Sequence, residues 1–289
     1  MSDEITVLLG LFDGLHLGHM SAVRELLKTG GKKLVFTFDS LSMTTKGVRG
    51  LLITDSEKRE RLLNLGADDV ISRDFGEIKD IAPDEFVGRI LQSELKAKKV
   101  ICGENFRFGK GGQADSEDLK KLCAAHGIET AIVPTVCMGG EVVSTTRIRR
   151  LIEGGQIERA NELLGYPYGF EGVISHGDRI GTKMGIKTVN IDFDPVRALP
   201  KKGVYMSRAE VLGMSFLGVT NVGTRPTVHD DGRTVIETHI LDFRSDIYGE
   251  TVKIDLLKFM REEKRFGSLE ELQKTVANDI HAVKSCQNI

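Results

Sequence analysis

The sequence predicts two domains of different fold class: an α/β domain with a parallel sheet, followed by a small β-barrel that ends in a helix. Three observations support this. The chain has 289 residues, about twice the length of one compact domain. Short apolar segments alternate with amphipathic, helix-like sequence up to residue 165, which favours a parallel sheet. Beyond that residue, strand periodicity dominates for about ninety residues.

The first half contains four apolar segments with the length and composition of buried strands, at 5–9, 34–38, 100–101 and 130–133. Helix-like sequence separates or follows them, at 18–28, from 54 onward, and at 83–94, 116–125 and 146–164. Thr54 and Glu57 have the spacing of a capping box, and Gly154 and Gly155 interrupt the last of these helices. This half is therefore expected to form a sheet with helical crossover connections.

The second half begins after turn residues at 165–169, so the expected domains are 1–165 and 166–289. Six β segments follow, at 170–175, 187–193, 203–211, 215–223, 234–243 and 251–260, with a hairpin turn expected at 230–232. That number suits a small closed barrel. Ser268 and Glu271 form another capping box ahead of an apolar stripe, which predicts a terminal helix that packs on the barrel.

Composition disfavours several classes of protein. A net charge of −2 lacks the electrostatic footprint of a protein whose main partner is nucleic acid. The early apolar run 5–12 is far shorter than the roughly 20 residues that cross a bilayer, and the acidic start MSDE lacks the basic flank of a secretory signal. We expect a soluble, cytoplasmic protein without a membrane partner. Its oligomeric state is left open.

The four cysteines have no CxxC spacing. This pattern argues against a structural zinc site, a redox motif and a disulfide framework. We expect all four, at positions 102, 123, 137 and 286, to be buried, reduced thiols.

Two histidines stand where the first predicted strand leads into the first predicted helix. The segment 10–19 reads GLFDGLHLGH and contains His16, Gly18 and His19. Free backbone N–H groups and the positive end of the dipole at a helix N-terminus favour phosphate. Gly18 would let the backbone approach the phosphate, and the imidazoles would donate to its oxygens. Two alternatives remain: a metal site, or ordinary loop histidines beside a helix cap.

A second polar segment precedes the last helix of the first half. It supplies hydroxyl and guanidinium donors from Ser144, Thr145, Thr146, Arg147 and Arg149. In a parallel sheet such strand ends meet at one edge, where these donors and the helix amides could bind a phosphate. The alternative is a simple N-cap followed by solvated arginines.

These segments together resemble the prokaryotic bifunctional riboflavin kinase/FAD synthetase family over essentially the whole chain. GLFDGLHLGH at 10–19 matches the pattern GxFDGxHxGH, VSTTRIR at 143–149 matches VSSTRIR, and GENFRFG at 103–109 matches a flavin-side loop. The resemblance implies a Rossmann-like nucleotidyltransferase domain followed by a six-stranded β-barrel domain of riboflavin-kinase type.

The resemblance also implies roles for individual residues of the first domain. His16 and His19 would bind the ATP phosphates and stabilise the transition state. The remaining ATP- and pyrophosphate-binding set would be Gly10, Phe12, Asp13, Gly18, Ser144, Thr145, Thr146, Arg147 and Arg149. Asn105 and Arg107 would lie near the nucleotide or flavin, although many relatives have aspartate in place of Asn105. The glycines at 103, 109, 111 and 112 would belong to this loop or simply form turns.

In the barrel half, the segment 181–190 resembles the kinase motif GRxLGFPTAN. The resemblance implies that Thr188 and Asn190 contact Mg²⁺ and ATP phosphates, and that Glu237 is the base for the riboflavin hydroxyl. Four departures surround the two ligands, with threonine at 182, isoleucine at 186, lysine at 187 and valine at 189. A phosphate contact from Lys187 could compensate. The histidines at 176, 229 and 239 have no metal-like spacing and are expected to be surface or core residues.

The predicted function is therefore FAD synthesis from ATP and FMN with release of pyrophosphate and with Mg²⁺ as cofactor. Because phosphoryl transfer depends on geometry, the departures in 181–190 predict weak or absent riboflavin kinase activity. Two alternatives are a fully bifunctional riboflavin kinase/FAD synthetase and a noncatalytic flavin or nucleotide sensor.

Overall fold

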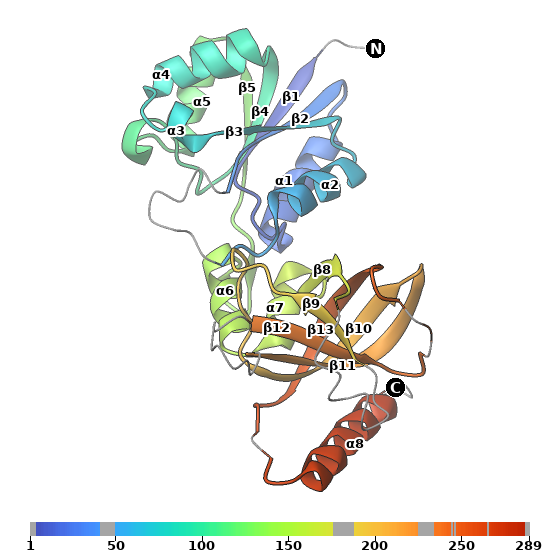
Figure 1. Cartoon of the computed structure of the whole chain (residues 1–289). Helices are drawn as coiled ribbons and strands as arrows, with labels where there is room; N and C mark the ends of the chain where they lie inside the picture. The colour runs from blue at the N-terminus through green and yellow to red at the C-terminus, as the bar shows by residue number, and fades with distance from the viewer. Residues whose placement is uncertain are drawn as a thin grey trace. The chain divides into compact units, whose positions relative to one another are not determined.

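The computed structural model describes residues 4–40, 50–175, 188–224, 234–243, 245, 247–264 and 266–286. The chain divides into two compact units, Met1–Arg147 and Ile148–Ile289, and the ribbon of each can be followed by its colour in Figure 1. This division falls within the helix that begins at Thr145, ahead of the turn at 165–169. Within the described residues no helix is long and apolar enough to cross a membrane.

The first unit contains a five-stranded parallel sheet of order β3-β2-β1-β4-β5. Its strands are β1 (Ile5–Leu9), β2 (Lys32–Phe38), β3 (Asp69–Arg73), β4 (Ala97–Gly103) and β5 (Glu129–Val133). The four predicted strands are confirmed. The edge strand β3 was not predicted, because only Val70 of its five residues is buried and the sequence is polar.

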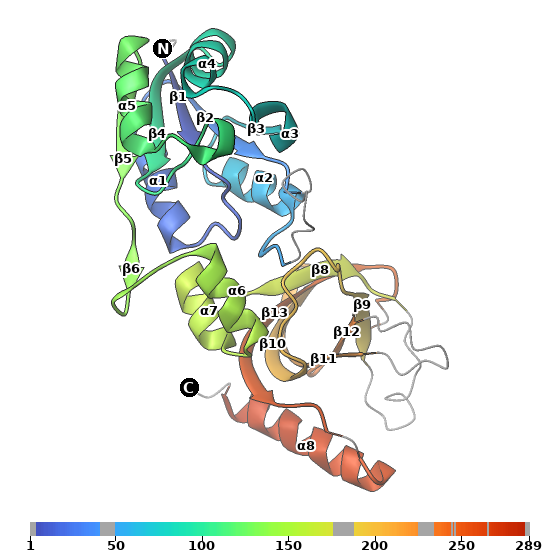
Figure 2. The same cartoon turned by 90° about the vertical axis from the view of Figure 1, so that its left-hand side faces the viewer.

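Helices cover both faces of this sheet (Figure 2). They are α1 (Leu17–Leu27), α2 (Asp55–Asn64), α3 (Phe75–Ile78), α4 (Pro83–Glu85), a π-helix (Phe86–Glu94), a short 3₁₀ turn (Lys110–Gly112) and α5 (Ser116–Ala125). Leu8 of β1 packs in one core with residues of α1 and α2. Val7 and Leu9 pack in the other core with residues of α5 and the π-helix. Burial on both faces explains the continuous apolar runs of the inner strands.

The first unit closes with a small hairpin, β6 (Cys137–Met138) and β7 (Glu141–Val142), ahead of α6 (Thr145–Glu153). The predicted helix at 146–164 is observed as α6 and α7 (Ile157–Leu164). The break falls at the predicted glycines, and Gly155 adopts a φ of 76°, which favours glycine.

The second unit contains six antiparallel strands in the order β8-β13-β10-β11-β12-β9. These are β8 (Gly169–Val173), β9 (Val189–Asp192), β10 (Gly203–Val211), β11 (Met214–Thr224), β12 (Thr234–Ile240) and β13 (Thr251–Arg261). A bridge between Ser175 and Asn190 joins the two ends of the sheet, so the barrel is nearly closed, as predicted. The hairpin turn predicted at 230–232 lies outside the described residues.

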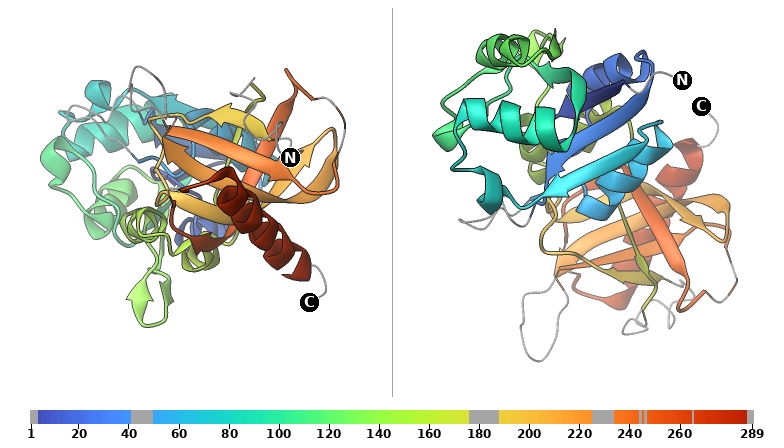
Figure 3. Two further views of the ribbon diagram at one scale, coloured as in Figure 1. Left: turned by 60° about the horizontal axis from the view of Figure 1, so that its bottom comes forward. Right: turned by 90° about the horizontal axis from the view of Figure 1, so that it is seen from above.

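The terminal helix α8 (Leu269–Ser285) packs on the outside of the barrel at β10 and β11 (Figure 3). Val283 contributes to a small core with Val204 and Val219. Ser268 caps the helix by accepting from the backbone N–H of Glu271 at 3.2 Å. The prediction that this helix packs on the barrel is therefore confirmed.

One prediction about the cysteines is wrong in part. Cys102 and Cys123 are buried, and burial raises the pKa of the Cys102 thiol to about 12. Cys137 and Cys286 are exposed, because the first lies on the β6–β7 hairpin and the second follows the last turn of α8.

Candidate active site

The loop between β1 and α1 is a tight turn that delivers two histidines to the helix N-terminus. Phe12, Gly14 and Leu15 all have positive φ values, of 56°, 84° and 39°. Phe12 and Leu15 are almost completely buried, so apolar packing offsets the cost of this unusual backbone. Position 10 has no room for a larger residue than glycine, because a Cβ there would lie 2.6 Å from Cζ of the buried Phe12 ring.

His16 is the N-cap residue of α1. Its Nδ1 accepts from the backbone N–H of His19 at 3.3 Å. A neutral imidazole that accepts at Nδ1 carries its proton on Nε2, so His16 retains one N–H donor for a ligand. The two rings are stacked, with centroids 3.7 Å apart and planes inclined by 14°.

Both imidazoles are neutral at pH 7. Burial lowers the pKa of His16 to about 4. Burial also lowers the pKa of His19 well below its usual 6.5, and the neighbouring His16 and Lys58 act in the same direction. Nδ1 of His19 is buried without a hydrogen-bond partner within the described part of the chain. A polar atom left in this way normally finds a partner, which a bound substrate can supply.

The two predicted segments come together in space. The Thr145 hydroxyl donates to the backbone carbonyl of Asp13 at 3.1 Å, across 132 positions of sequence. A Cβ added to Gly18 would lie 3.4 Å from the carbonyl oxygen of Val143. The N-terminus of α1 and the segment before α6 therefore form one locus at the carboxyl edge of the sheet, where α/β folds bind ligands.

Asp13 has a positioning role in this arrangement. Its carboxylate accepts from the backbone N–H groups of Leu52 and Ile53, at 2.8 and 3.4 Å. These bonds tie the histidine loop to the segment that leads into α2.

The Ser144–Arg149 segment is only partly available to a ligand. The Ser144 hydroxyl accepts from the backbone N–H of Arg147 at 3.4 Å, which caps α6. The Arg147 guanidinium donates to the carbonyls of Met138, Glu141 and Val142 and pairs with the Glu141 carboxylate at 2.6 Å. Arg147 therefore holds the β6–β7 hairpin. Thr146 is exposed and Arg149 is half-buried on α6.

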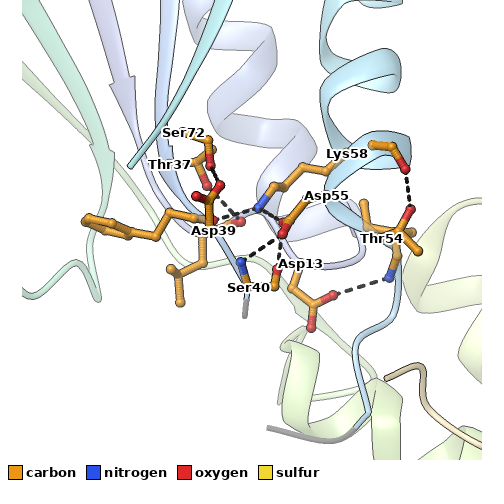
Figure 4. Close-up of polar contacts among 12 residues, drawn as sticks. Asp13, Thr37, Asp39, Ser40, Thr54, Asp55, Lys58 and Ser72 are labelled. Atoms are coloured by element: carbon orange, nitrogen blue, oxygen red, sulfur yellow. Dashed lines mark hydrogen bonds and ion pairs between the residues drawn. The ribbon is translucent and has the colours of Figure 1, made fainter. Parts of the chain in front are cut away.

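One polar residue near the histidines was not predicted from the sequence: the buried Lys58. Lys58 of α2 has a side chain only 4% exposed. Its Nζ lies 2.8 Å from the Asp55 carboxylate and donates to the carbonyl of Phe38 at 3.0 Å. Ser40 donates to the same carboxylate through its hydroxyl and its backbone N–H (Figure 4). Its burial could have been inferred from its position in the sequence, because Lys58 stands one helical turn before Leu62 on the buried side of α2.

The loop 103–109 is more exposed. Asn105 is exposed, and Arg107 lies 3.7 Å from the Asp115 carboxylate with its side chain 61% exposed. Positive φ values identify Gly109, Gly111 and Gly112 as turn glycines, whereas Gly103 has an ordinary backbone.

A second polar cluster lies on the barrel. Thr188 donates through Oγ1 to Oε1 of Glu237 at 2.6 Å. Asn190 is the register partner of Glu237, and Asn221 pairs with Glu237 from the other side. Directly opposed residues in an antiparallel sheet share a face. The three predicted kinase residues are therefore brought together.

The departures at 182, 186 and 187 and the histidines at 176 and 229 lie outside the described residues. His239 lies on β12 and is half-buried.

Comparisons with known proteins agree with this division of the chain. The family described as FAD synthetase matches residues 1–147, and the family described as riboflavin kinase matches residues 164–287. A bifunctional riboflavin kinase/FMN adenylyltransferase of Listeria monocytogenes is 35% identical over 281 residues, covering 94% of this chain and 88% of the relative. The protein of that description from Escherichia coli is 34% identical over 284 residues, covering 94% and 89%.

A solved structure shares the fold over almost the whole length. It is described as a macrolide-efflux protein from Streptococcus pneumoniae, with a TM-score of 0.88, 28% identity, and coverage of 98% of this chain and 95% of that one. The sequence relatives and both family matches converge on one assignment. The chain belongs to the bifunctional riboflavin kinase/FMN adenylyltransferase family.

Proposed function

We propose that the first unit transfers AMP from ATP to FMN and releases pyrophosphate. The observation that carries this proposal is the pair of stacked, neutral imidazoles of His16 and His19 at the N-terminus of α1. Neutral N–H donors and free helix amides bind phosphate oxygens without adding a proton that the reaction would need to remove.

In this reaction an oxygen of the FMN phosphate attacks the α-phosphorus of ATP in line. One P–O bond forms, and the bond to the leaving pyrophosphate breaks. The FMN phosphate is already ionised at pH 7, so no base is required. The chain contributes positioning and charge stabilisation: the Nε2–H of His16 donates to oxygens that gain charge, and Asp13 and Thr145 hold the two segments together.

The remaining predicted site residues keep their roles as part of this proposal. Gly10 and Phe12 shape the turn, and Gly18 keeps the helix entrance open to the phosphates. Ser144, directly before α6, and Thr146 and Arg149 on that helix would contact pyrophosphate, while Asn105 and Arg107 would meet the nucleotide or flavin from the exposed loop. The proposed domains are 1–165 and 166–289, acting on small-molecule substrates in the cytoplasm.

A product assay tests the adenylyltransferase. Purified chain with FMN, ATP and Mg²⁺ should yield FAD and pyrophosphate in equal amounts. Replacement of His16 or His19 by alanine should lower kcat by roughly 10²-fold to 10³-fold, the scale for loss of one preorganised donor. Tight binding of FMN and ATP without any product would instead support the sensor alternative.

Riboflavin phosphorylation by the barrel is the second candidate function. The Thr188–Glu237 hydrogen bond of 2.6 Å favours it, because it places a carboxylate base beside a hydroxyl ligand. Val189 is buried and is the register partner of Thr238, which is fully buried. Since side chains alternate along a strand, this departure points into the barrel, away from Thr188 and Asn190.

The oxygen donors of this cluster fit Mg²⁺. A hydroxyl, an amide carbonyl and a carboxylate are the hard ligands that Mg²⁺ prefers, so Thr188 and Asn190 would hold the ion. When bound, Mg²⁺ would neutralise part of the triphosphate charge. The side chains themselves orient the phosphates, and Glu237 accepts the proton of the riboflavin hydroxyl.

The degenerate-loop hypothesis and the fully bifunctional alternative predict different rates of riboflavin phosphorylation. The departures in 181–190 predict that riboflavin and ATP yield FMN much more slowly than FMN and ATP yield FAD. In that case Lys187→Pro with Val189→Ala should raise the rate. Comparable rates for the two reactions, with loss of FMN formation in Glu237→Gln, would establish the fully bifunctional alternative and contradict the degenerate-loop argument.

A further inference from the structure

A concave site lies at the opposite edge of the parallel sheet from the histidines. It is a cavity of about 600 Å³ at the amino ends of β2, β1 and β4, which are adjacent strands. Its floor is formed by Ile5 and Ala97, which are register partners. The five residues of β1 separate this cavity from the histidine loop, a span of about 16 Å.

The cavity is lined by cations. Lys32, Lys96 and Lys98 are three of its eight lining residues and all three are exposed, and no lining residue carries a carboxylate. In the part of the chain that the structure describes, none of the three has an ion pair or a side-chain hydrogen bond. Their neighbour Lys99 is paired with Glu129 at 2.6 Å. Three unpaired like charges around one concavity repel one another and attract an anion.

His126 forms the polar wall of the cavity and is held in place. Its Nδ1 lies 3.1 Å from Oε1 of Gln92, and its Nε2 lies 3.3 Å from the Asp84 carboxylate. The Asp84 carboxylate is thereby directed at the imidazole, and within the described residues it pairs with none of the three lysines.

The backbone at Lys96 is a second, independent observation. This residue has a φ of 52°, in the left-handed region that glycine or asparagine adopts more easily. A lysine in such a turn costs stability relative to glycine. The side chain it supplies to the cavity offers a functional reason for that cost.

We propose that this cavity is a binding site for an anion bearing two or three linked phosphates. The charge of three ammonium groups is balanced better by several linked phosphates than by a single phosphate. The volume of the cavity lies within the range of small-molecule sites. Inorganic polyphosphate and a nucleoside triphosphate share this chemistry. Of the two, only the nucleoside triphosphate carries a nucleoside that could also contact the apolar floor formed by Ile5 and Ala97.

Calorimetric titration of the full chain with inorganic tripolyphosphate, without Mg²⁺, tests the proposal. We expect a binding event that persists in the His16→Ala, His19→Ala double variant, in which the proposed site at the N-terminus of α1 is removed. It should weaken by about tenfold or more in the triple variant Lys32→Gln, Lys96→Gln, Lys98→Gln, since three surface ion pairs are lost. The matched control replaces exposed lysines elsewhere, Lys79, Lys120 and Lys274, and removes the same charge.

Two outcomes would overturn the proposal. One is unchanged binding in the triple variant, and the other is equal weakening in the matched control, which would show attraction by net charge alone. Titration of the histidine double variant with ATP separates the two sources: binding that is tighter than that of tripolyphosphate and that is lost when the three lysines are also replaced would identify a nucleotide.

A single variant distinguishes binding from a structural role. Lys96→Gly relieves the strained backbone and removes one ammonium. We expect its Tm to equal or exceed that of the wild type while tripolyphosphate binds more weakly. A lower Tm with unchanged binding would mean that Lys96 serves the fold alone.

Discussion

Replacement of Gly18 by alanine is a sharp test of the histidine pair, because it separates stability from catalysis. A Cβ at this position would lie 3.0 Å from Cε1 and 3.1 Å from Nδ1 of His16, and 3.4 Å from the carbonyl oxygen of Val143. Ordinary carbon contacts begin near 3.5 Å. The imidazole must therefore move by roughly 0.5 Å, since the backbone carbonyl blocks retreat on the other side.

The expected effect on the two properties has opposite sign. Gly18 lies within α1 and has no positive φ, so alanine should favour the helix by up to about 1 kcal/mol. A misplacement of about 1 Å costs on the order of 100-fold in rate, so a shift of half that size should lower kcat by about tenfold. The new methyl group would also narrow the approach of phosphate to the helix amides.

Steady-state FAD synthesis and urea denaturation of the same preparations measure the two properties. Gly30→Ala is the matched control, because a Cβ there meets nothing within 4 Å and its φ is ordinary. We expect this control to keep wild-type kcat. Full activity in Gly18→Ala would refute the inferred role of the His16 orientation.

Three further predictions concern groups around the same site. The pKa of His16 falls from 6.5 in the unfolded chain to about 4 in the fold, so its contribution to stability is complete above pH 6.5 and is lost as pH falls toward 4. That loss amounts to about 3 kcal/mol. It is measured as the free energy of unfolding between pH 6.5 and pH 4, and the same pH dependence in the wild type and in His16→Gln would contradict the prediction. Asp13→Ala should destabilise the chain by about 1–3 kcal/mol because two backbone amides lose their acceptor, whereas Asp13→Asn, which keeps an acceptor oxygen, should cost less in the same melt; equal losses would argue against the hydrogen bonds. Lys58→Met should cost about 1–3 kcal/mol by leaving Asp55 unpaired, and adding Asp55→Asn should restore part of it; a double variant as unstable as the single one would disprove the pairing argument.

Local sequence patterns were sufficient for most of the elements. The apolar run of β1, the capping box at Thr54 and the stripe of α8 each depend on residues a few positions apart. The same holds for the histidine loop, because HxGH after a strand and before a helix places both rings at the helix N-terminus. These features follow from backbone periodicity and cap chemistry, which act within one or two turns of chain.

Features that depend on a distant partner were decided by the tertiary structure. No local pattern shows that Arg147 holds the β6–β7 hairpin, that Lys58 donates to the carbonyl of Phe38, or that Val189 points into the barrel. Each of these side chains acquires its contacts only when a segment distant in the sequence packs against it.

The edge strand β3 and the cavity at the amino ends of the strands illustrate the same limit. A half-buried strand such as Asp69–Arg73 carries too few apolar residues for its periodicity to be recognised. Lys32 and Lys98 are separated by 66 positions in the sequence and line the same cavity only because β2 and β4 flank β1 in the sheet. The sequence by itself determined most of the elements and the chemistry at the entrance of α1. The order of the strands decided which distant lysines lie at the same edge of the sheet, because pairing between strands is set by the packing of the whole chain.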